Sequence, residues 1–143
     1  MLIFMFLVFH MTFFLESHWF VLKETQIIAF FILFLLFEDF LWFVFNPYFG
    51  LKNFKKEKVW WHSKSKWTFG LFPIDYILGL AVSIILLYFS SLIGTNKIIF
   101  YEGLITIGFM FFLTFLSILF VKSYRRWYKD IRKKDEKHKF DMG

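Results

Sequence analysis

Two adjacent carboxylates, Glu38 and Asp39, stand inside a long run of aromatic and aliphatic residues. An ionisable residue in a membrane-crossing segment costs free energy unless a partner compensates it, so such residues often belong to functional sites. A carboxylate can bind a cation, exchange a proton or pair with an imidazole. We therefore expect the chemistry of this chain to be centred on Glu38 and Asp39.

A divalent metal ion is one way to compensate these charges. Carboxylates and imidazoles are ligands that suit zinc, iron or manganese, and one bound ion would neutralise several buried charges together. The chain contains no cysteine, so thiolate ligands, disulfides and a cysteine nucleophile are excluded. The predicted metal ligands are His10, Glu38, Asp39, His62 and Asp75.

The catalytic hypothesis assigns Glu38, Asp39 and His62 to a site where a metal-activated water attacks a lipid or an amphiphile. Side chains that would line the substrate pocket lie on the same helical face or in the loop that follows, at Trp42, Asn46, Trp60 and Trp61. The chain has neither an HExxH motif nor paired ExxH spacings. The site therefore requires that separate segments converge.

A structural role is the alternative for the same residues. Glu38 and Asp39 would then pair with lysines of the following loop or accept hydrogen bonds from tryptophan and asparagine side chains. Asp75 would lie in the first turn of a helix, where the helix dipole favours a carboxylate. In this interpretation the protein is a non-catalytic membrane scaffold.

Composition indicates the environment of these side chains. Of the 143 residues, 59% are hydrophobic and 26% aromatic, and the mean hydropathy is +0.59. A soluble domain of this length has too small an interior for so much apolar surface. The sequence predicts an all-α integral membrane protein with four transmembrane helices in an antiparallel bundle, and an aromatic and basic interfacial loop between helices 2 and 3.

The predicted single transmembrane domain, 1–143, consists of four spans and a basic tail, at about 2–22, 26–45, 73–92, 98–121 and 122–143. A short turn is expected at Lys23-Glu24-Thr25, which would put His10 level with the two acids on the neighbouring helix. Asn46-Pro47 should end the second helix, because a residue before proline is driven from the helical region. Small residues on one face of the third helix, including Gly79 and Ser83, predict close packing.

The uneven distribution of the net charge of +6 predicts the orientation. Six of the 17 lysines and arginines lie between residues 46 and 72, and nine lie from residue 122 onward. The positive-inside rule puts both segments in the cytoplasm, so we expect a multi-pass protein of the cell membrane with both termini cytoplasmic. Anionic lipids of the inner leaflet are the expected partners. No nucleic-acid-binding motif accompanies the basic tail, so no nucleic-acid partner is expected.

Four short spans with a glutamate in the first, Glu16, resemble the small multidrug resistance transporters. In that family, a glutamate of this helix binds a proton or a cation within a dimer. The resemblance implies coupled transport of protons or cations by a homo-oligomer as an alternative function. The basic aromatic loop and the Glu38-Asp39 pair depart from the family pattern.

Overall fold

The computed structural model describes residues 2–16, 21–94 and 97–141, with side chains described over 2–11, 21–94 and 97–134. Most of the described chain is helical. Two short 3₁₀ turns, η1 and η2, and a two-stranded antiparallel ribbon of β1 and β2 join the second helix to the third. In chain order the elements are α1 (Leu2–Glu16), α2 (Val21–Phe45), η1 (Leu51–Asn53), η2 (Trp60–His62), β1 (Trp67–Thr68), β2 (Phe72–Pro73), α3 (Ile74–Ile93) and α4 (Lys97–Asp141).

Within the described residues, three helices are long and apolar enough to cross a membrane: α2, α3 and the Lys97–Lys134 part of α4. The 20 residues of α3 extend about 30 Å at a rise of about 1.5 Å per residue, which matches the hydrocarbon thickness of a bilayer. α1 has 15 residues and extends only about 22 Å. The structure therefore supports three of the four predicted spans, and the fourth stays a prediction.

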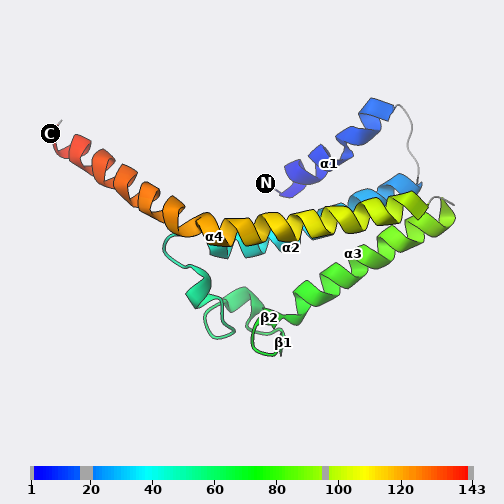
Figure 1. Cartoon of the computed structure of the whole chain (residues 1–143), viewed down its shortest axis with the longest axis horizontal. Coiled ribbons are helices and arrows are strands. Elements are labelled where there is room, and N and C mark those ends of the chain that lie inside the picture. Colours follow the sequence, from blue (N-terminus) through cyan, green and yellow to red (C-terminus); the bar gives the residue numbers. More distant parts are fainter. Residues whose placement is uncertain (1, 17–20, 95–96, 142–143) are drawn as a thin grey trace.

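α2, α3 and α4 pack together, and α3 diverges from the other two toward the loop (Figure 1). The core between them is formed by buried side chains of all three helices, Ala29, Leu33, Phe37, Leu87 and Ile107. Gly79 approaches α2 so closely that an added Cβ would lie 2.9 Å from the Leu36 side chain. Ser83, one turn further along, is fully buried. The predicted packing face of small residues on the third helix is therefore confirmed.

The boundary between the first two helices differs from the prediction. Lys23-Glu24-Thr25 does not form a turn, because α2 already begins at Val21. Glu24 lies in the first turn, where the positive end of the helix dipole favours an acid, and the Thr25 hydroxyl donates to the Leu22 carbonyl at 2.7 Å. The connection to α1 therefore precedes Val21, and residues 17–20 lie outside the described part of the chain.

α2 ends at Phe45, as the sequence predicts from Asn46-Pro47. The Asn46 side-chain oxygen accepts hydrogen bonds from the backbone amides of Tyr48 and Phe49 at 2.9 and 3.0 Å, which closes a turn directly after the helix. The end of α2 is also bound from α4, because Arg125 Nη2 donates to the carbonyls of Val44 and Asn46 at 2.9 and 3.2 Å. A cation is favoured here by the negative end of the helix dipole.

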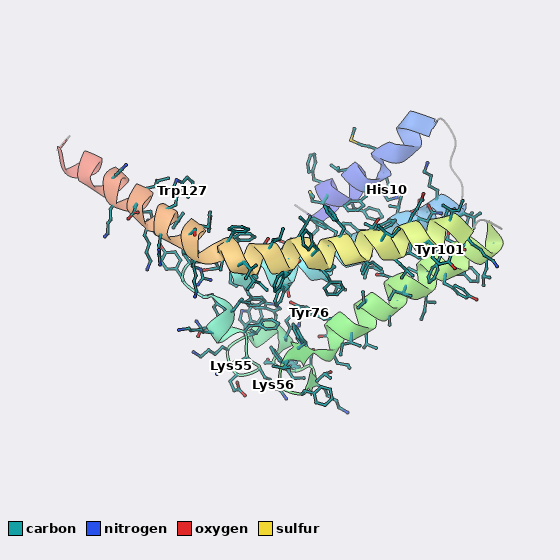
Figure 2. All side chains as sticks on the ribbon, in the orientation of Figure 1. His10, Lys55, Lys56, Tyr76, Tyr101 and Trp127 are labelled. Atoms are coloured by element: carbon teal, nitrogen blue, oxygen red, sulfur yellow. The ribbon has the colours of Figure 1, made fainter. Side chains whose placement is uncertain are left out.

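α4 continues as a helix through the predicted basic tail and extends beyond the other helices (Figure 1). Trp127 lies on this extension (Figure 2). The described side chains of residues 122–134 include exposed lysines and arginines. The tail is thus a helical continuation of the last membrane-length segment rather than a separate domain.

Candidate functional site

Asp39 is the residue at which the candidate site converges. Its Oδ2 atom lies 3.0 Å from His62 Nε2, and its Oδ1 atom accepts a hydrogen bond of 3.3 Å from Trp61 Nε1. The Tyr76 hydroxyl donates to Oδ2 as well. These donors come from η2 and α3, so the loop and the third helix both close on a carboxylate of α2. The predicted need for compensation of this half-buried acid is met by three hydrogen-bond donors.

His62 connects Asp39 to a second carboxylate. Its Nδ1 atom lies 3.4 Å from Asp75 Oδ2, at the start of α3. Its backbone carbonyl accepts a hydrogen bond of 3.1 Å from Trp67 Nε1. The two ring nitrogens of His62 therefore face carboxylate oxygens from two different helices. We name Asp39, His62, Asp75 and Tyr76 the polar cluster.

The two carboxylates of the polar cluster have different surroundings. The Asp39 side chain is 29% exposed and receives three donors, whereas the Asp75 side chain is 47% exposed, accepts a hydrogen bond from the Ser65 hydroxyl and lies near His62 Nδ1. Asp39 therefore fixes the orientation of the imidazole. Nδ1 faces the more accessible side, where a polar group could replace Asp75 and exchange a proton with the ring.

Aromatic side chains hold the loop against α2. Phe43 is fully buried, and its ring stacks on Trp61 with centroids 5.5 Å apart and contacts Phe54 at 4.7 Å. Trp42 meets Trp61 edge-on at 5.8 Å. Such ring contacts add specific geometry to the burial of apolar area. The aromatic packing therefore positions Trp61, and with it the neighbouring His62, over the end of α2.

A cavity of about 370 Å³ lies next to the polar cluster. The side chains of α2, β2, α3 and α4 that line it are apolar except for those of Tyr76 and Thr114. Tyr76 belongs to both features, because its ring lines the cavity while its hydroxyl donates to Asp39. Figure 2 shows Tyr76 near the start of α3, in the angle between this helix and α4. The cavity can hold an apolar group whose polar end reaches the cluster.

His10, a predicted metal ligand, lies away from the polar cluster. Its Nε2 atom is 3.0 Å from Glu24 Oε1, and its Nδ1 atom is 2.8 Å from the Phe6 carbonyl oxygen. Glu24 precedes Glu38 by 14 residues, or about 21 Å along a helix. The prediction that His10 lies level with Glu38 and Asp39 was wrong, because α1 ends and α2 begins earlier than predicted, which shifts the register of the two helices.

The structure does not support the predicted metal site. Within the described residues, no group of three or more histidine, aspartate and glutamate side chains is arranged to hold a metal ion. Asp39 and Asp75 lie on opposite nitrogens of His62, so the imidazole separates the carboxylates. Glu38 is half-buried, and no described side chain donates a hydrogen bond to it or forms an ion pair with it. The two adjacent acids therefore do not act as one ligand pair.

The predicted pocket residues divide into two groups. Trp42 and Trp61 lie beside the polar cluster. Trp60 is 78% exposed, and the Asn46 side chain is used in the turn after α2. Glu16, on which the transport alternative depends, ends α1, and its side chain lies outside the described part of the chain. The geometry therefore retains two of the four predicted pocket residues.

Three side chains were not assigned to the site from the sequence: Tyr76, a member of the polar cluster, and Ser65 and Trp67, which bind to Asp75 and to the His62 carbonyl. Tyr76 directly follows Asp75, and this proximity is its only signal in the sequence. Ser65 and Trp67 lie three and five residues after His62, in a loop without helical periodicity. Their roles depend on how the loop folds back on α2 and α3.

Comparisons of the chain with models of known protein families, with curated proteins and with solved structures give no match. A function must therefore be inferred from the geometry of the polar cluster and of the cavity beside it.

Proposed function

We propose that this is a membrane protein that binds an amphiphile, with the apolar chain of the ligand in the cavity and its polar group at the polar cluster. The supporting observation is the double role of Tyr76, whose ring lines the cavity and whose hydroxyl contacts Asp39. Binding pockets of small molecules are commonly apolar, have volumes of about 300–1,000 Å³ and contain a few oriented polar groups. An amphiphile has the same two-part chemistry as this site.

The proposed ligand enters from the bilayer. The cavity lies between α2, α3 and α4, which are the helices of membrane-spanning length. The lysine-rich loop and the α4 extension would face the cytoplasm by the positive-inside rule. This orientation puts the polar cluster toward the inner leaflet, whose lipids then reach the cavity sideways between the helices. The amino terminus would be cytoplasmic as well if α1 completes a fourth span.

The polar cluster can also take part in proton exchange with the bound polar group. His62 Nε2 is held by Asp39, as an acid–base imidazole is held in many enzymes by a carboxylate that fixes its tautomer and orientation. A ligand that displaces the more exposed Asp75 would meet Nδ1. Binding is the primary proposal, and catalysis would require this displacement.

To test this proposal, a larger side chain is introduced into the cavity and the binding of an amphiphile is measured. Leu80 lines the cavity, whereas Leu78 on the same helix is exposed. We expect Leu80→Trp to weaken binding of a fluorescent acyl-chain amphiphile by detergent-solubilised protein by about tenfold, or about 1.4 kcal/mol. Leu78→Trp adds the same side chain outside the cavity and should bind like the unmodified protein. Unchanged binding in a folded Leu80→Trp variant would refute the proposal.

Tyr76→Phe gives a second, independent measurement. This variant keeps the aromatic wall of the cavity and removes the hydroxyl that donates to Asp39. We expect an uncharged acyl probe to bind as before, while the preference among probes with different polar groups changes. Loss of binding for all probes to the same extent would show that the polar cluster does not select the polar group.

A further inference from the structure

The tip of the β1–β2 ribbon presents large apolar side chains to the outside. Phe69, Gly70 and Leu71 connect the paired residues Thr68 and Phe72. The Leu71 amide donates to the Thr68 carbonyl at 3.0 Å, which closes a tight turn. Phe69 is 94% exposed and Leu71 is 63% exposed. Contacts within the described chain therefore do not explain why these two positions are apolar.

The backbone of this turn makes Phe69 more unexpected. Its φ angle is +50°, and Gly70 follows with a φ angle of +70°. A turn with positive φ at both central residues is typically built from asparagine, aspartate or glycine, and a bulky residue there costs free energy. Because the Phe69 side chain makes almost no contact with the described residues, their packing gives no compensation. A surface outside the chain can provide it.

The surroundings of the tip match a membrane surface with negative charge. α3, a helix of membrane-spanning length, begins at Ile74, so the tip lies near the level at which this helix would enter a bilayer. Lys64 and Lys66, just before β1, are exposed. Lys55 and Lys56 lie at the edge of the same loop (Figure 2). Apolar rings that enter the headgroup region beside hydrated lysines are characteristic of interfacial segments.

We propose that the Phe69-Gly70-Leu71 tip inserts into the headgroup and upper acyl region of an anionic phospholipid leaflet, with Lys64 and Lys66 beside the lipid phosphates. Burial of the two apolar side chains in lipid offsets the cost of the backbone conformation, and the lysines add attraction to negative charge. Phe72, the next residue, lines the cavity. Insertion of the tip would therefore hold Phe72, and with it this side of the cavity, next to the lipid leaflet.

The experiment measures the depth of the tip in vesicles. Because the chain has no cysteine, a fluorophore can be attached to the full-length protein at Leu71→Cys, with Lys56→Cys as the exposed control on the same loop. In phosphatidylcholine–phosphatidylglycerol vesicles, we expect spin-labelled lipid to quench the Leu71 probe and aqueous iodide to quench it several-fold less than the Lys56 probe. Equal iodide quenching of the two probes would overturn the proposal.

Two further comparisons separate insertion from other contacts of the tip. Phe69→Asn places a residue that tolerates positive φ in the turn and removes the apolar ring. We expect iodide quenching of the Leu71 probe to rise several-fold, while the thermal midpoint in detergent is unchanged or higher. A lower midpoint would show that Phe69 packs on protein, a second copy included, and would refute insertion. Equal protection in pure phosphatidylcholine vesicles would refute the preference for anionic lipid.

Discussion

His62 Nε2 lies 3.0 Å from Asp39 Oδ2, although the two residues are 23 positions apart in the chain. The contact joins η2 to α2, and the other nitrogen of the same ring approaches Asp75 at the start of α3. A single imidazole therefore connects both helices that the loop joins. The stability of the loop and the shape of the candidate site should depend on this connection.

Asp39→Asn is expected to destabilise the protein. The substitution removes the charge that pairs with His62 and changes the acceptor of the Trp61 and Tyr76 hydrogen bonds. Hydrogen bonds to charged groups contribute about 1.5–3 kcal/mol, so we expect a loss of that order in the free energy of unfolding, measured by denaturation in detergent micelles. Glu38→Gln is the matched control and should change stability by no more than about 0.5 kcal/mol, because no described side chain pairs with Glu38. Equal effects of the two variants would contradict the asymmetry between these acids.

A double-mutant cycle tests the register of α1 against α2. His10 contacts Glu24 and not Asp39. Residues in direct contact show interaction energies of about 0.5–3 kcal/mol, whereas distant pairs are additive within about 0.5 kcal/mol. We expect coupling between His10→Ala and Glu24→Gln, and additivity between His10→Ala and Asp39→Asn, in the free energy of unfolding. Coupling only between His10→Ala and Asp39→Asn would contradict the observed register of α1 against α2 and support the one predicted from the sequence.

Arg125→Met should weaken the junction between α2 and α4. The guanidinium donates to the Val44 and Asn46 carbonyls at the end of α2, and methionine keeps much of the apolar stem without these donors. Leaving buried acceptors unpaired costs about 1–3 kcal/mol, which denaturation in detergent would detect. Arg126→Met, at an exposed neighbouring position, is the control. Similar stability of the two variants would show that the carbonyls find other donors.

Accessibility labelling in intact cells tests the orientation. We expect a membrane-impermeant maleimide to label Lys97→Cys, at the start of α4, and not Lys56→Cys, in the basic loop, until the membrane is opened. Both positions are exposed in the structure, so a difference in labelling reports the side of the membrane. The opposite pattern would place the lysine-rich loop outside and reverse the proposed orientation.

The sequence predicts much of the fold because apolar length and helix-ending residues are local properties. The end of α2 before Asn46-Pro47 follows from the backbone preference of a residue that precedes proline. The position of Asp75 in the first turn of α3 follows from the helix dipole. Close packing at Gly79 follows from the spacing of small residues. The start of α2 was predicted about five residues late, since Lys23 and Glu24 are polar enough to suggest a turn but also suit the first turn of a helix.

The sequence alone identified Asp39, His62 and Asp75 as residues able to share one site, because acids and histidines in an apolar chain require partners. Only the tertiary structure determined that His62 lies between the two carboxylates, that His10 pairs with Glu24, and that Tyr76 joins the cluster to the cavity. The physical reason is that helix register and loop path are set by packing between distant segments. Here α1 ends six residues earlier and α2 begins five residues earlier than predicted, so His10 faces Glu24 instead of Glu38, and no local pattern specifies this change.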